Sequence, residues 1–170
     1  MTRRGFLKRG VFGGAILACG GLGLGLWPTR LDRQPRRKLR VLNERQFAIL
    51  SAVAARTVQA PGADPIEIAS RVDDTLALQA PEVRHDIGQL LLLFDNALAG
   101  LFLDARPRPF TRLSPAGQDA VLDAWRRSRL TVRRGGYNVL RKLTQAAHYS
   151  SPSTWASVGY PGPPEISQPT

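Results

Sequence analysis

The chain has 170 residues, of which 43% are hydrophobic, and a formal net charge of +11. Residues 1–40 hold ten Lys or Arg and one Asp, whereas the remaining residues hold fourteen basic and twelve acidic side chains, a net charge of only +2. A nucleic-acid-binding protein carries its positive charge on the folded domain, so this distribution argues against nucleic acid as a partner. The residues after position 40 are enough for one domain with a single core.

The N-terminus has the pattern of an export signal. Its key residues are Arg3, Arg4, Phe6, Leu7 and Lys8. They precede an apolar run, Val11 to Trp27, whose six glycines make it less apolar and less helical than a membrane-spanning segment. This pattern resembles the twin-arginine signal, a receptor-read address that directs the export of folded proteins. The alternative interpretation is a plain membrane anchor whose arginines face the cytoplasm.

The resemblance implies that the twin-arginine translocase carries the chain to the periplasm or to the outer face of the cytoplasmic membrane. Residues 11–27 would then allow association with the membrane. Cys19 is the only cysteine, and the residues before it faintly resemble a lipoprotein cleavage box, although Leu17 is bulky for its position. Cleavage of the segment, its retention as an anchor and lipidation at Cys19 all stay open.

Helical signals begin after a polar, basic linker. We therefore divide the chain into a signal and linker segment, residues 1–40, and a helical domain, residues 41–170. Asn43, with Gln46 three residues later, forms a capping-box pattern at the start of a first helix. Asp64 caps a second helix, which has Pro at its first position and Glu at its third.

Three further helices are expected in the rest of the domain. Pro81 opens the third, whose apolar run from Leu90 to Phe94 predicts burial at the centre of the domain. Ser114 caps a fourth helix, and a fifth is expected over 131–147, although Gly135-Gly136 weakens its first turns. No stretch alternates with period two. The sequence predicts an all-α domain, a single bundle of about five helices, followed by an irregular tail rich in Pro, Gly and aromatic residues.

The domain shows no catalytic, cofactor-binding or metal-binding pattern. There is no haem or iron–sulfur motif and no serine nucleophile elbow, and the two histidines, His85 and His148, are not in a zinc-binding spacing. Asp73-Asp74 is a candidate carboxylate pair, but neighbours on a helix point in different directions, which favours a solvated face. We therefore expect no catalytic residue, no metal and no cofactor in this chain.

Two features suggest contact with a partner protein. An arginine cluster that includes Arg133 and Arg134 is either a solvated turn between helices or a docking surface for an acidic partner. The tail carries Tyr149, Trp155 and Tyr160, aromatic residues that must pack either against the bundle or into a partner. These five residues are the partner-binding candidates.

The C-terminal half also resembles a known family. The residues that carry the resemblance are Leu113-Ser114-Pro115, Ala124-Trp125, Ser128-Arg129, Arg133-Arg134, Tyr137, Leu140, His148-Tyr149-Ser150, Pro152, Trp155 and Gly159-Tyr160-Pro161-Gly162-Pro163. They are similar to the gluconate 2-dehydrogenase subunit 3 family. The resemblance implies a small helical subunit, regarded as non-catalytic, that accompanies an FAD-dependent dehydrogenase of the glucose–methanol–choline oxidoreductase class, often with a multihaem cytochrome c.

The expected function combines the signal with this resemblance. The chain would bind the FAD-dependent large subunit in the cytoplasm, escort it through the twin-arginine route, and mature and stabilise it. FAD would belong to the partner. Two alternatives stay open: a membrane-anchored helical envelope protein without an enzyme partner, and an enzyme whose site is not recognisable from the sequence.

Overall fold

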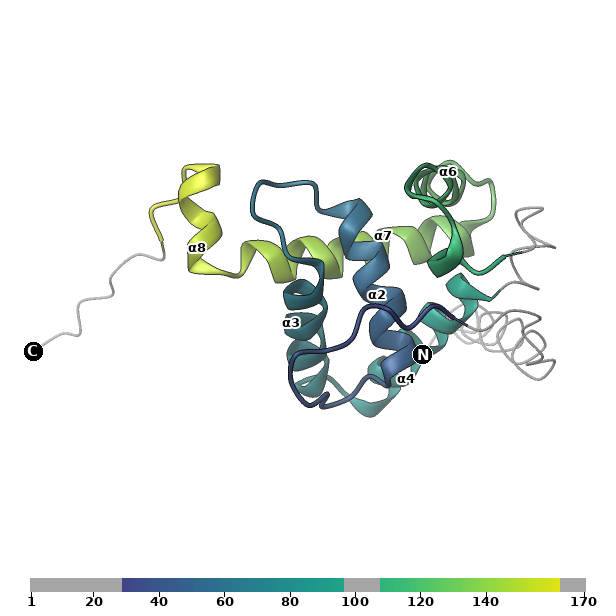
Figure 1. Ribbon diagram of the computed structural model, residues 1–170, viewed down its shortest axis with the longest axis horizontal. Helices are drawn as coiled ribbons and strands as arrows, with labels where there is room; N and C mark the ends of the chain where they lie inside the picture. Colours follow the sequence, from purple (N-terminus) through teal and green to yellow (C-terminus); the bar gives the residue numbers. More distant parts are fainter. Residues whose placement is uncertain (1–28, 97–107, 163–170) are drawn as a thin grey trace, which may run out of the picture.

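The structure, a computed structural model, describes residues 29–96 and 108–162, and these are helical without strands, so the all-α prediction is confirmed. The α-helices are α2 (Glu44–Thr57), α3 (Pro65–Ala77), α4 (Pro81–Asp95), α6 (Pro115–Arg126), α7 (Thr131–Tyr149) and α8 (Pro152–Trp155), with the 3-10 helices η1 (Phe110–Arg112) and η2 (Ala156–Val158). Helix α7 runs the length of the bundle, and α2, α3 and α6 pack against it (Figure 1). The export-signal residues Arg3, Arg4, Phe6, Leu7 and Lys8, with the apolar run and Cys19, lie outside the described residues.

The predicted helix starts are confirmed by their caps. The Asn43 side chain accepts a hydrogen bond from the backbone of Gln46 at 2.9 Å, and the Gln46 side chain accepts one from the backbone of Asn43 at 3.0 Å. Asp64 and Ser114 cap α3 and α6 without the reciprocal bond: the Asp64 side chain accepts from the backbone of Ile66, and the Ser114 side chain accepts from the backbone of Gly117. Each such cap contributes about 1 kcal/mol, so these helix ends are fixed by local sequence.

The centre of the bundle is α2, and the prediction that the helix opening at Pro81 takes this place was wrong. Eight consecutive residues of α2, from Phe47 to Ala54, are buried. In α4 only the C-terminal half reaches the core, and Val83 in its first turn is 42% exposed. The reason is that the first turns of α4 are mostly polar, whereas the apolar positions of α2 continue along its length.

An aromatic cluster joins α4, η1 and α6. The ring of Phe94 lies 4.7 Å from that of Phe110, and also 4.7 Å from that of Trp125 in an edge-on arrangement. Helix α7 packs closely over this cluster at Gly136, which is buried. The Gly135-Gly136 pair therefore does not fray the helix, which begins at Thr131 as expected, because the second glycine allows a close contact.

The tail is more regular than expected. Helix α7 continues to Tyr149, and a single helical turn, α8, leads into η2 before the chain turns at Gly159 with a φ of 67°. This turn projects beyond the bundle at the end of α7 (Figure 1).

Candidate partner-binding site

Residues 29–42, which we name the strap, form no helix or strand and run over the helices as the purple segment in Figure 1. Their main anchor is Asp73, whose carboxylate accepts hydrogen bonds from the backbone of Arg40 at 2.6 Å, Val41 at 3.0 Å and Leu42 at 2.8 Å. Asp73 is only 2% exposed. The expectation that it belongs to a solvated face was therefore wrong, because three backbone N–H groups from a distant segment replace water around its charge.

A second buried carboxylate holds the other end of the strap. Asp95 accepts hydrogen bonds from the hydroxyl of Thr29 at 2.7 Å and from the backbone of Thr111 at 2.8 Å. The Thr29 hydroxyl also accepts one from Arg45 at 2.7 Å. Both ends of the strap are thus tied to the bundle by polar groups with little access to water.

The aromatic residues of the tail contact one another through a hydrogen bond and a ring contact. The indole N–H of Trp155 donates to the carbonyl of Tyr149 at 3.1 Å, and the Trp155 and Tyr160 rings pack edge-on with centroids 5.3 Å apart. The backbone of Tyr160 donates to the carbonyl of Trp155 at 3.0 Å. We name Tyr149, Trp155, Val158 and Tyr160 the aromatic knob.

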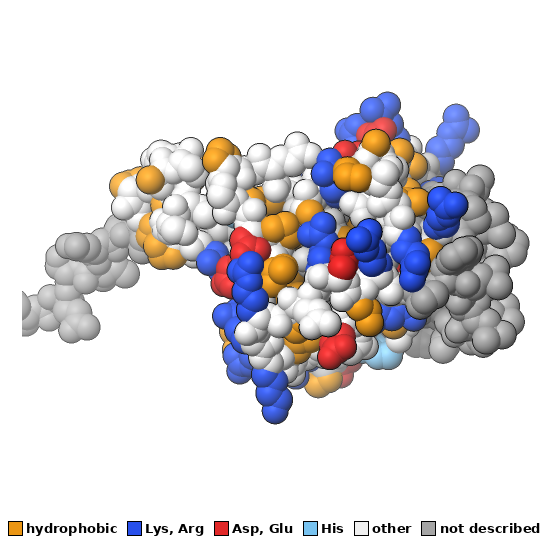
Figure 2. Space-filling view, viewed as in Figure 1, with side chains coloured by type: hydrophobic (Ala, Val, Ile, Leu, Met, Phe, Trp, Pro, Cys, Tyr) orange, Lys and Arg blue, Asp and Glu red, His pale blue; other side chains and the backbone are white. Residues whose placement is uncertain are grey.

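The aromatic knob is not part of the core. Tyr149, Val158 and Tyr160 are 42%, 54% and 46% exposed, and no residue of α8 or η2 is buried. Hydrophobic side chains gather over this end of the molecule in Figure 2. The structure therefore contains a preformed apolar projection, since the fold orders these side chains without covering them.

Arg133 and Arg134 lie at the opposite end of α7, and both side chains make contacts within the bundle. The guanidinium of Arg133 lies 5.7 Å from the centroid of the Trp125 ring, and burial lowers the pKa of Arg133. Arg134 donates to the carbonyl of Ser128 at 2.6 Å in the turn before α7. About 24 Å of helix separates Arg133 from Tyr149, so the partner-binding candidates form two groups rather than one patch.

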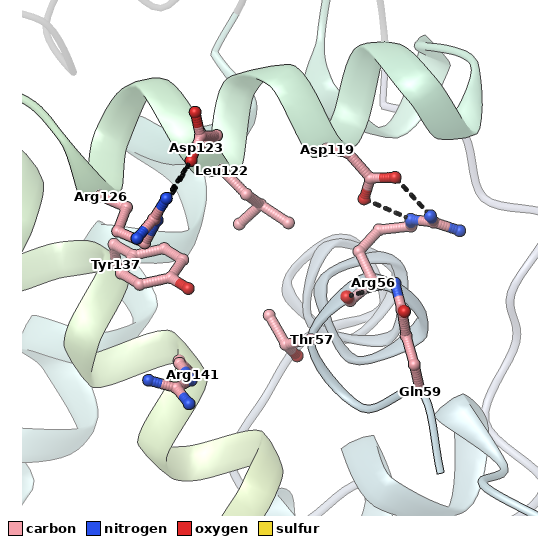
Figure 3. Close-up of a pocket in the computed structure, with 9 residues that line it drawn as sticks. All are labelled: Arg56, Thr57, Gln59, Asp119, Leu122, Asp123, Arg126, Tyr137 and Arg141. Carbon is pink, nitrogen blue, oxygen red and sulfur yellow. Dashed lines mark hydrogen bonds and ion pairs between the residues drawn. The ribbon is translucent and has the colours of Figure 1, made fainter. Parts of the chain in front are cut away.

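A polar pocket that the sequence did not indicate lies where the end of α2 meets α6 and α7. Its volume is about 340 Å³. Figure 3 shows the residues that line it: Arg56, Thr57, Gln59, Asp119, Leu122, Asp123, Arg126, Tyr137 and Arg141. Arg56 makes a two-point ion pair with Asp119, and Arg126 pairs with Asp123 at 2.7 Å. These bonds hold the pKa of each aspartate below its usual value.

The described residues contain no group of three His, Cys, Asp or Glu side chains placed to hold a metal ion. His85 is exposed, whereas His148 is buried at the end of α7, and burial together with the nearby charge of Arg71 lowers the pKa of His148. In the part of the chain that is described, no helix combines the length and apolar composition needed to cross a bilayer.

Comparison with known families agrees with the sequence and the fold. A family model described as gluconate 2-dehydrogenase subunit 3 matches residues 44–162, a range that runs from the start of α2 past η2. A comparison with curated proteins and with solved structures finds no match. The family match covers well over half of the chain, so this protein belongs to the gluconate 2-dehydrogenase subunit 3 family.

Proposed function

We propose that this chain is a non-catalytic small subunit that binds an FAD-dependent dehydrogenase of the glucose–methanol–choline class, such as a gluconate 2-dehydrogenase. It escorts that partner through the twin-arginine route, aids its maturation and stabilises it at the periplasmic side of the membrane. The family's name supports a place in such a complex. FAD belongs to the partner, and a cytochrome c subunit would complete the complex.

The observation that carries this proposal is the aromatic knob. Trp and Tyr supply much of the binding energy of protein interfaces when they enter apolar pockets. Here the indole of Trp155 is already fixed by its bond to Tyr149 and its contact with Tyr160. A partner that receives the aromatic knob therefore orders few further side chains, which reduces the entropic cost of association.

The strap supports the export part of the proposal. Thr29 follows the signal segment almost directly, and its side chain is buried against Asp95. Little free chain therefore separates the signal from the folded domain. In the proposed route the signal and the folded domain are exported together, as the twin-arginine route requires of its cargo.

The test is purification of the tagged full-length chain from cells that also produce the flavoprotein, followed by an absorption spectrum of the eluate. Trp155→Ala and Tyr160→Ala should each reduce the co-purified flavin about tenfold or more. Leu78→Ala is the control, because Leu78 is 80% exposed on the surface at the end of α3. A wild-type chain that elutes alone and colourless would contradict the proposal.

Export is tested separately. Replacing Arg3 and Arg4 by lysine should leave the partner dehydrogenase in the cytoplasm, because we propose that the partner has no export signal and crosses the membrane on the signal of this chain. Dehydrogenase activity that still reaches the periplasm would show that the partner does not depend on this chain.

A further inference from the structure

Charged side chains line the pocket between α2, α6 and α7, and most of them form ion pairs with one another. Arg56 is paired with Asp119, and Asp123 accepts from both Arg126 and Arg127 at distances of 2.7 to 3.1 Å. These pairs shape the walls and fix their side chains. They leave little capacity to bind anything else.

Two polar groups of the pocket are left without such a bond among the described residues. They are the hydroxyl of Tyr137 and the guanidinium of Arg141, both carried by α7 one turn apart (Figure 3). A phenol hydroxyl and a guanidinium are hydrogen-bond donors, and the guanidinium has the planar geometry that fits a carboxylate. Leu122 also lines the pocket, but it belongs to the core and is only 6% exposed, so it adds a small apolar contact to walls that are mainly polar.

The surrounding charge favours an anionic ligand. Residues 108–162 contain nine Lys or Arg and only two acidic residues, Asp119 and Asp123, which are already paired with arginines. This part of the domain thus carries a net charge of +7, although the whole of residues 41–170 carries only +2. A positive surface of this kind attracts and orients an acidic surface on a partner.

The pocket and the aromatic knob lie on the same side of the bundle. The C-terminal end of α2, helix α6 and helix α8 all lie along the upper edge of Figure 1. Arg141 and Tyr149 are about 12 Å apart along α7. A standard interface covers about 800 Å² on each protein, so one partner surface can contact both.

We propose that this pocket receives the carboxylate of an Asp or Glu side chain from the partner flavoprotein subunit, with Arg141 and the Tyr137 hydroxyl as its donors. This inference rests on the proposed function. The aromatic knob supplies apolar contact, and the pocket fixes the orientation in which the two subunits meet.

The experiment measures the dissociation constant of the full-length chain for the separately purified flavoprotein, at about 50 mM and about 500 mM NaCl. Arg141→Gln and Tyr137→Phe should weaken binding at low salt, the former about tenfold or more. Arg141→Gln should also reduce the dependence of binding on salt. The control is Arg129→Gln, which removes the same charge from an exposed position in the turn between α6 and α7 and should change the constant less than about twofold.

Equal effects of Arg141→Gln and Arg129→Gln would overturn the inference and leave the proposed function intact. Arg141→Lys keeps the charge but not the planar donor pair, and an affinity between those of the wild type and Arg141→Gln would support a carboxylate held by that pair. Saturable binding of sodium gluconate to the chain alone, followed by NMR at Tyr137, would assign the pocket to a free organic acid and overturn the inference. Absence of any complex with the wild-type chain would instead refute the proposed function.

Discussion

Gly136 lies at the closest contact between α7 and the aromatic cluster, and Gly136→Ala tests how tightly that contact is packed. A methyl group there would lie 2.9 Å from the end of Leu90 and 2.9 Å from the ring of Trp125. Leu90 can move, but the Trp125 ring is held by Phe94 and is only 2% exposed. Alanine gains about 1 kcal/mol of helix propensity over glycine, and overpacking costs about 1 to 3 kcal/mol. We expect Gly136→Ala to lower the free energy of unfolding by about 1 kcal/mol.

The neighbouring Gly135 provides the matched control. A methyl group at Gly135 would have no other atom within 4 Å, so Gly135→Ala should gain the propensity term alone, about 1 kcal/mol. Urea denaturation of the full-length variants, followed by circular dichroism, measures both changes. A Gly136→Ala protein as stable as the Gly135→Ala protein would show that the contact with Leu90 and Trp125 is not close enough to exclude a methyl group.

The strap and His148 give two further predictions. Asp73→Asn should lower the free energy of unfolding by about 2 to 3 kcal/mol, because an amide keeps only one oxygen for three backbone donors. It should also speed tryptic cleavage in the strap, whereas Asp74→Asn should cost less than about 1 kcal/mol, because Asp74 makes only exposed ion pairs. Burial and the charge of Arg71 lower the pKa of His148 in the folded chain below its ordinary value of 6.5. Just below pH 6.5, His148 is therefore protonated to a greater extent in the unfolded chain than in the folded chain. Stability should therefore fall as the pH drops below about 6.5, and His148→Gln should reduce this slope. An unchanged slope would exclude His148 as its source, and equal costs for the two aspartate variants would contradict the anchoring role of Asp73.

The sequence predicted the features that depend on neighbouring residues. The capping box at Asn43, the Asp64 cap and the Ser114 cap each need only a few residues in order, and each is present in the structure. Hydrophobic periodicity likewise predicted the helical class. It could not rank α2 and α4 by burial, because a run of apolar residues shows that a helix has a buried face but not how many neighbours cover it.

The features that sequence reasoning missed come from segments far apart in the chain. The partners of Asp73 lie more than thirty residues before it. The pocket joins Arg56 of α2 to Tyr137 and Arg141 of α7, which no local motif connects. Asp73-Asp74 illustrates the difference, since both aspartates contact the strap but in opposite environments. Asp73 is buried and accepts backbone N–H groups of the strap, whereas Asp74 makes an exposed ion pair with Arg37.

The two groups of partner-binding candidates differ in what binding would require of them. Withdrawing Arg133 from the Trp125 ring to meet a partner would give up a contact inside the bundle before a new one formed. The aromatic knob needs no such rearrangement, since Tyr149, Val158 and Tyr160 are already exposed and Trp155 is fixed beneath them by bonds that a partner need not break. Association at the end of α7 that carries the aromatic knob therefore has the lower cost. The positive charge near the pocket between α6 and α7 then serves to orient the partner. Arg141 suits that task better than Arg133 or Arg134, because it is exposed and forms no bond with another side chain of the described residues.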